Sequence, residues 1–110
     1  MTARPQGQMN PWMPIADPMM QRRLGKTAEE LSELLGVIAR IGIQGIDEID
    51  PASGKTNRQR FHEETADVIA QINCNFRAFD MPADDIDERV QMKEAQMAEW
   101  EALLTSPQAP

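Results

Sequence analysis

Two pairs of acidic residues with the same spacing stand out in this 110-residue chain. Glu30 and Glu33 form the first pair, and Glu64 and Asp67 form the second. Residues three apart share one face of an α-helix, so two such helices side by side would aim four carboxylates at one point. Carboxylate oxygens are the ligands that Mg²⁺ and Mn²⁺ prefer, and crowded carboxylates repel one another unless a cation neutralises them. The spacing therefore predicts a Mg²⁺ or Mn²⁺ site with these four residues as ligands.

Each pair lies in an apolar, helix-like stretch, EELSELLGVIAR for the first and EETADVIAQI for the second. These stretches, their order and the loop between them resemble the E-x-x-E and E-x-x-D motifs of the MazG-like, all-α nucleoside triphosphate pyrophosphohydrolases, over roughly residues 20 to 104. The resemblance implies a metal-dependent enzyme that cleaves the bond between the α and β phosphates and releases a nucleoside monophosphate and pyrophosphate. It also implies that Glu30, Glu33, Glu64 and Asp67 bind the metal, and that the chain forms a homodimer or homotetramer.

The small one-domain form, with its long loop and Pro-rich arm, is similar to the phage-encoded branch of that family. This similarity implies dGTP or GTP as the first substrates to consider, and the host cytoplasm as the location. Two other readings of the sequence stay open. One is phosphoribosyl-ATP pyrophosphohydrolase, which has the same helical architecture, and the other is a non-catalytic helical interaction module whose acids are only solvated surface.

Several side chains near the acidic pairs could assist catalysis. Glu63 could bind a second metal ion or polarise the attacking water, or else face the solvent. Lys26, four residues before Glu30, could reach a substrate phosphate or form a surface ion pair with Glu30. Gln71 and Asn75 continue the face of the second pair and could contact the base or ribose, or be amides satisfied within the protein.

Other candidates for substrate binding lie further away in the sequence. Lys93 stands about where members of the family often carry a basic residue that contacts the triphosphate, although it could equally be a solvated lysine. Trp12 could stack on a base or anchor the N-terminal arm. A basic cluster could meet phosphates or balance acidic neighbours across a subunit interface, and it comprises Lys55, Arg58 and Arg60.

The hydrophobic spacing predicts three helices that would position these residues. Apolar side chains recur at steps of three, four or seven over residues 20 to about 42, about 56 to 79, and 84 to about 104. Pro82 ends the second helix, and three aspartates then enrich the start of the third. We therefore expect an all-α bundle of three to four helices that is completed by oligomerisation, with an arm at 1–19, the catalytic helical domain at 20–104 and a tail at 105–110.

The segment 42–57 is rich in turn-forming residues and predicts a long loop between the first two helices. Loops of this length are typically functional or disordered. Gly54-Lys55-Thr56 lacks the earlier glycine of a phosphate-binding loop, because Ile49 occupies that position. The acids at 47, 48 and 50 lack the spacing of a calcium-binding loop and predict a solvated acidic turn.

The composition excludes several classes of protein. A net charge of −7 argues against binding to nucleic acid by its phosphates, which needs a basic surface. A single cysteine, Cys74, excludes a disulfide scaffold and favours a reducing cytoplasm. No apolar run approaches the length of a membrane span, so no membrane partner is expected. The arm carries Trp12, Met13 and Ile15, which predicts that it packs on the body or on a neighbouring subunit.

Overall fold

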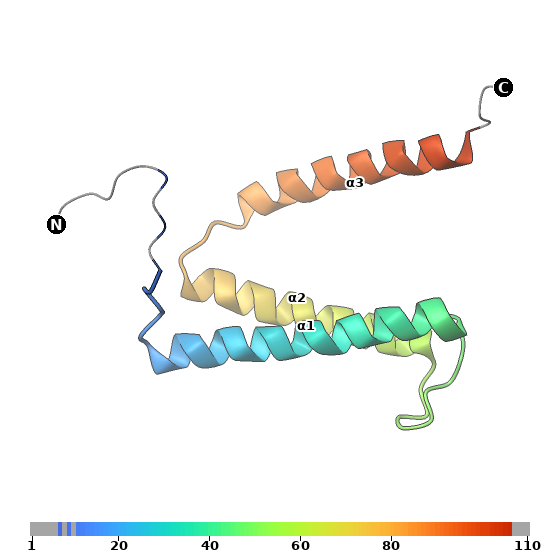
Figure 1. The fold of residues 1–110 in the computed structure, drawn as a ribbon, viewed down its shortest axis with the longest axis horizontal. Coiled ribbons are helices and arrows are strands. Elements are labelled where there is room, and N and C mark those ends of the chain that lie inside the picture. Colours follow the sequence, from blue (N-terminus) through green and yellow to red (C-terminus); the bar gives the residue numbers. More distant parts are fainter. Residues whose placement is uncertain (1–6, 8, 10, 107–110) are drawn as a thin grey trace. The chain divides into compact units, whose positions relative to one another are not determined.

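A computed structural model describes residue 7, residue 9 and residues 11–106, and these residues form an all-α chain (Figure 1). The helices are α1 (Pro18–Gln44), α2 (Asn57–Ala78) and α3 (Asp84–Thr105). Within this described part the β pairing is limited to one isolated bridge between Ile49 and Thr56. The predicted all-α class is confirmed. The chain divides into two compact units, one reaching to Asn75 and the other beginning at Phe76.

Helix α1 begins two residues earlier than the hydrophobic spacing predicts. The carboxylate of Asp17 accepts a hydrogen bond from the backbone N–H of Met19 at 2.9 Å and so caps the helix. Pro18 fits at the first helical position, where no intrahelical N–H is needed. The assignment of Pro18 to an extended arm was therefore wrong. At the other end, Gly45 adopts φ +100° and donates its N–H to the carbonyl of Ile41 at 2.9 Å.

The connection between α1 and α2 is an ordered loop that folds back on itself. Asp50 N–H donates to the Lys55 carbonyl and Gly54 N–H donates to the Asp50 carbonyl, both at 2.8 Å. Gly54 has φ +73°, a conformation that a residue with a Cβ rarely adopts. These bonds give the long loop a defined shape, and the N–H groups of Asn57 and Arg58 at the start of α2 donate to the carbonyls of Glu48 and Ile46 in the loop.

Asp50 is the anchor of this loop, and the prediction that it belongs to a solvated turn was wrong. Its side chain is only 7% exposed, and Oδ1 lies 2.7 Å from Arg40 Nη1 on α1. The Ser53 N–H donates to Oδ2 at 3.0 Å, and Arg60 on α2 lies 3.9 Å away. The hydrogen bonds from Ser53 and the charges of Arg60 and Arg40 lower the pKa of Asp50. One buried carboxylate thus joins the loop to both helices.

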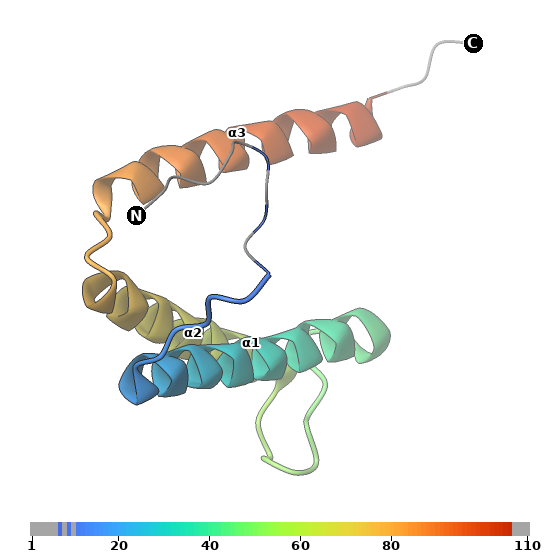
Figure 2. The same ribbon diagram turned by 60° about the vertical axis from the view of Figure 1, so that its left-hand side comes forward.

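The contact between α1 and α2, which run alongside each other in Figures 1 and 2, is largely polar. Val37 and Val68 are the only buried apolar side chains among the described residues. Asn57 is fully buried and donates from Nδ2 to the Gly45 carbonyl at 2.9 Å. The remaining buried side chains of α1 are Thr27 and Glu30. The first two helices are therefore joined by polar side chains at least as much as by a hydrophobic core.

Much of the predicted apolar surface stays exposed in this single chain. On α1 the apolar side chains that lie beside the buried residues are exposed to solvent. On α2 one aromatic side chain before Val68 and one aliphatic side chain after it are also exposed. The exposed side chains are Leu24, Leu31, Leu35 and Ile38 on α1, and Phe61 and Ile69 on α2. This exposure agrees with the expectation that a second subunit completes the bundle, which remains a prediction.

In the second unit, a tight turn leads from α2 to α3. Asp80 takes a left-handed conformation with φ +54°, and Met81 N–H donates to the Phe76 carbonyl at 2.9 Å, which closes the end of α2. Helix α3 then begins after Pro82 with three aspartates in its first turn, as predicted. None of its residues is buried.

The described part of the N-terminal arm contacts α1 at one point, where the side-chain amide of Gln21 donates to the Ile15 carbonyl, and two of its large side chains are mostly exposed. Trp12 is 86% exposed and Met13 is 77% exposed. That the arm packs on the body or on a neighbouring subunit stays a prediction. Residues 1–6, 8 and 10 of the arm and 107–110 of the tail lie outside the described part. None of the described helices has the length and apolar character needed to cross a membrane.

Candidate metal centre

Three of the four predicted metal ligands come together where α1 and α2 meet. Glu30 and Glu33 lie one turn apart on α1, and Glu64 faces them from α2. One carboxylate oxygen from each of the three residues lies within 4.8 Å of the others. We call Glu30, Glu33 and Glu64 the acidic site. Its two α1 members share a face because they are three residues apart, and the polar α1–α2 contact supplies the third.

Glu30 is the buried member of the acidic site. The residue is only 8% exposed, and its Oε2 atom has no hydrogen-bond partner within the described part of the chain. Glu64 is half-buried, and its Oε2 is likewise buried without a partner. A buried carboxylate oxygen without a partner is unfavourable, because it loses its hydration and gains nothing in return. Both atoms therefore suit a bound cation.

The charges of the acidic site oppose one another. The negative charge of Glu30 is the largest cause that raises the pKa of Glu33, followed by loss of hydration and by the charge of Glu64. A divalent cation would reverse this effect by stabilising the ionised carboxylates. Glu33 is exposed, so the site is open to solvent on its side.

Lys26 lies beside the acidic site on α1. Its Nζ is 3.1 Å from Glu29 Oε1 and 3.2 Å from Glu30 Oε1. The hydrogen bonds to these two acids, that to Glu29 first, raise the pKa of Lys26. The surface ion pair that we predicted as one alternative for Lys26 is thus present. Its contact with a substrate phosphate stays a prediction.

Two other predicted acids lie near the acidic site without joining it. Asp67 is exposed on α2, one turn after Glu64, and it is not part of the group of three. Glu63 accepts a hydrogen bond from Lys55 Nζ at 2.8 Å, and both side chains are about half exposed. The roles of Asp67 as a fourth ligand and of Glu63 as a catalytic residue stay predictions.

Asn75 makes a structural bond across the two helices. Its Nδ2 donates to Thr27 Oγ1 at 2.6 Å, and Thr27 Oγ1 donates in turn to the Arg23 carbonyl at 2.8 Å. The donor of this amide is thus engaged within the protein, as in the structural alternative that we gave for it. Gln71, one turn earlier on the same face of α2, is half-buried.

The other candidates are placed as follows. Lys93 lies on α3 in the second unit, where it lines a groove. Trp12 lies in the arm, largely exposed. The basic cluster pairs with acids of its own chain, because Lys55 contacts Glu63, Arg58 contacts Asp47, and Arg60 contacts Asp50. These pairs lie within one chain, so contacts of the cluster with phosphates or with acids across a subunit interface stay predictions.

Sequence reasoning missed three residues that position the site. Thr27 and Asn57 are buried polar residues at the α1–α2 contact, and Asp50 anchors the loop. Asn57 had a usable signal, because it stands at the predicted start of a helix, where Asn side chains commonly bond to backbone groups. The burial of Thr27 and Asp50 gave no local signal, since each also bonds to a residue on another element, Thr27 to Asn75 and Asp50 to Arg40.

Comparison with known proteins gives no match, whether to family models, to curated proteins or to solved structures. The case for the acidic site therefore depends on its residue types, their burial and their geometry. The convergence of Glu30, Glu33 and Glu64 and the partnerless oxygens of Glu30 and Glu64 are the two observations that carry it.

Proposed function

We propose that this chain is a metal-dependent nucleoside triphosphate pyrophosphohydrolase, which converts a (deoxy)nucleoside triphosphate to the monophosphate and pyrophosphate. The observation that carries the proposal is the buried, partnerless Oε2 of Glu30 within a group of three carboxylates. These three residues belong to the two motifs that resemble those of the MazG-like family.

In this proposal Glu30, Glu33 and Glu64 hold Mg²⁺ or Mn²⁺, with Asp67 as a further ligand. The bound cation supplies charge neutralisation for the triphosphate and lowers the pKa of the attacking water. Burial fixes the position of Glu30, and the exposed carboxylate of Glu33 faces incoming substrate. Glu63 is the proposed base that orients the water, once its ion pair with Lys55 opens.

Lys26 is the proposed phosphate contact on α1. Its ammonium lies 3.2 Å from a Glu30 oxygen, and its side chain is half exposed. It can therefore turn from the carboxylates towards a bound triphosphate without unburying itself. Gln71 and the amide oxygen Oδ1 of Asn75, which has no hydrogen-bond partner within the described residues, are the proposed contacts for base or ribose, and Trp12 is a further candidate.

The proposed bond is the one between the α and β phosphates. No phosphate-binding loop supports transfer of the γ phosphate, and Lys55 of the Gly-Lys-Thr sequence is paired with Glu63. The first substrates to test are dGTP and GTP, as the resemblance suggests. A homodimer or homotetramer in the cytoplasm completes the proposal, with no role for nucleic acid.

A panel of ribo- and deoxynucleoside triphosphates, together with phosphoribosyl-ATP, tests this proposal. We expect hydrolysis with Mg²⁺ or Mn²⁺, and in oxygen-18 water the label should enter the monophosphate. Glu30→Gln should lower activity by at least about a hundredfold, because the remaining acids cannot hold the cation in the same geometry. Glu99→Gln, an exposed change on α3, should leave activity unchanged.

Each other outcome has a definite meaning. Label in pyrophosphate, or release of diphosphate, would show that a different bond breaks. Turnover of phosphoribosyl-ATP alone would favour the phosphoribosyl-ATP pyrophosphohydrolase alternative. No turnover of any compound, together with no binding of Mn²⁺, would leave only a non-catalytic interaction module.

A further inference from the structure

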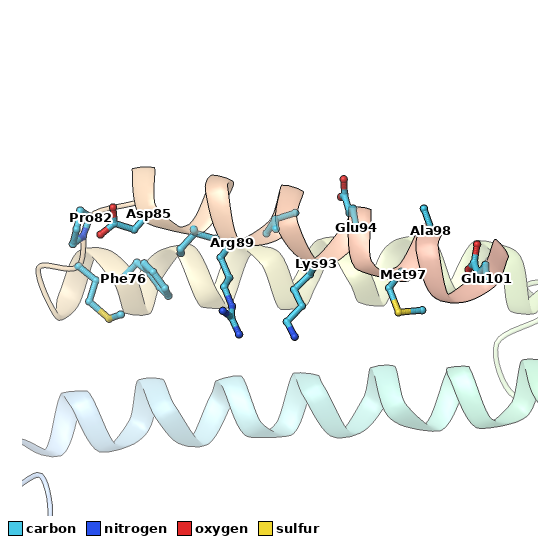
Figure 3. A pocket seen from close by; sticks show the side chains of 12 residues that line it. Phe76, Pro82, Asp85, Arg89, Lys93, Glu94, Met97, Ala98 and Glu101 are labelled. Atoms are coloured by element: carbon cyan, nitrogen blue, oxygen red, sulfur yellow. The ribbon is translucent and has the colours of Figure 1, made fainter. Parts of the chain in front are cut away.

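Helix α3 carries an open groove along one of its faces (Figure 3). The groove has a volume of about 830 Å³ and is lined by side chains of the second unit alone. Its apolar lining along α3 comes from Ile86, Val90 and Met97. Figure 3 shows Arg89 and Lys93 on one margin, with Glu94 and Glu101 on the other. The groove is thus an apolar strip between a basic and an acidic edge.

Four residues that line the groove, Ile86, Val90, Lys93 and Met97, belong to a seven-residue repeat that continues along α3 beyond the groove to Trp100 and Leu104. Val90, Met97 and Leu104 occupy one position of the repeat, and Ile86, Lys93 and Trp100 occupy the position four residues before or three after it. This is the a and d pattern of a coiled-coil seam, in which a second helix packs its own a and d side chains into the first. Val90, Met97, Trp100 and Leu104 are between 45% and 63% exposed. The seam is therefore uncovered in the single chain.

The charges beside the seam favour a second copy of the same helix as the partner, in parallel orientation. Arg89 is at position g, whereas Glu94 and Glu101 are at position e, as is Asp87. In a parallel pair of identical helices, g of one helix lies beside e of the next heptad on the other. Arg89 then meets Glu94 of the second copy, and symmetry makes this pair twice. In an antiparallel pair e meets e, which would set the two acidic edges against each other.

We propose that α3 pairs in parallel with α3 of a second copy of this chain, through the seam from Ile86 to Leu104. Lys93 then lies in the seam at a d position. A polar residue in a seam costs stability but specifies the alignment of the two helices. The pairing assigns Lys93 to this contact in place of the triphosphate contact that the family resemblance implies, and it is independent of the acidic site in the first unit.

Charge reversal in the full-length protein tests the pairing. Arg89→Glu and Glu94→Arg each turn two attractive pairs into two repulsive ones, so each should weaken self-association by roughly tenfold or more. The double variant should restore it. An equimolar mixture of the two single variants should also restore it, because both pairs of the mixed dimer are then attractive. Sedimentation or light scattering over a range of concentrations gives the dissociation constants.

The control is Glu99→Arg, which makes the same change in charge on the side of α3 away from the seam and should leave self-association unchanged. Circular dichroism checks that every variant keeps its helices. A monomeric wild-type protein would overturn the proposal. It would also be overturned if neither single variant changed the dissociation constant of the dimer. Failure of the mixture to associate would also overturn it, because it would show that Arg89 and Glu94 contact something other than each other across two copies.

Discussion

At Glu30 the cost of burying a carboxylate is only partly offset within the chain. One oxygen lies 3.2 Å from Lys26, whereas the other is buried with no partner in the described structure. Loss of hydration without a compensating bond is costly, so the residue is better suited to a cation than to a structural role. Glu64 shows the same feature on α2. A purely structural pair of helices would gain stability from replacing either acid.

The metal-free protein should lose stability as the pH rises above 4.5, the ordinary pKa of a glutamate. The pKa of Glu33 is raised in the folded protein, chiefly by the charge of Glu30, so the folded state binds this proton more tightly than the unfolded chain does. The resulting stabilisation is complete below pH 4.5 and is lost as the pH rises through the raised pKa. Glu33→Gln removes this dependence.

Melting temperatures measured against pH, with a chelator present, compare the wild-type protein with Glu33→Gln. Asp47 and Asp50 act in the opposite sense, because their lowered pKa values cost stability as the pH falls below 3.8. The two effects are therefore separated in pH. Curves for the two proteins that run parallel above pH 4.5 would show that Glu33 does not feel the charge of Glu30.

At the scale of the elements, the α1–α2 contact depends on specific polar bonds. Only Val37 and Val68 are buried apolar side chains in the described structure, while Asn75 and Thr27 join the helices by a 2.6 Å bond. The acidic site lies on the same contact, between residues of these two helices. The geometry of the acidic site therefore depends on the polar hydrogen bonds that hold α1 and α2 together.

Replacing Thr27 with valine, which has nearly the same shape, should destabilise the protein by about 1–3 kcal/mol, because Asn75 Nδ2 loses its acceptor inside the contact. Thr27→Ser is the matched control. It keeps the hydroxyl and loses one methyl group, so it should cost only about 0.8 kcal/mol. Urea unfolding followed by circular dichroism gives both values. A valine variant as stable as the serine variant would contradict the structural role of this bond.

The sequence predicts the helices well, because their hydrophobic spacing, Pro82 and the glycines after α1 are local signals. It does not predict which face of α2 meets α1. The apolar side chains of α2 include Phe61, Val68 and Ile69, yet only Val68 of these three is buried, and the fully buried residue of α2 is the polar Asn57. That choice depends on how whole helices meet, and local periodicity carries no information about it.

In the candidate site, too, some features follow from local spacing and others depend on how the helices meet. Glu30, Glu33 and Glu64 could be found from spacing, because helix geometry fixes which residues share a face. The separation of Asp67 from this group could not be foreseen, since it depends on the rotation of α2 against α1. The burial of Asp50 was equally hidden, because its partner Arg40 is on another element.

At the scale of the whole molecule, the described chain buries little apolar surface for its length. A domain of this size needs a substantial core to offset the loss of conformational entropy. Large apolar side chains are nevertheless exposed on all three helices. Self-association is the simplest way to cover them, and the seam on α3 offers a contact with defined direction. The net charge of −7 further suits a protein that binds cations.

The binding of Mn²⁺, followed by thermal unfolding, tests the central claim most directly. At a hundredfold excess of Mn²⁺ over its Kd, the wild-type protein should gain about 2.7 kcal/mol of stability, because the ion binds only the folded state. Glu99→Gln should gain the same amount. Glu30→Gln should gain little or nothing, although its metal-free form should be at least as stable as the wild type. An equal gain in Glu30→Gln and in the wild-type protein would contradict the assignment of the acidic site.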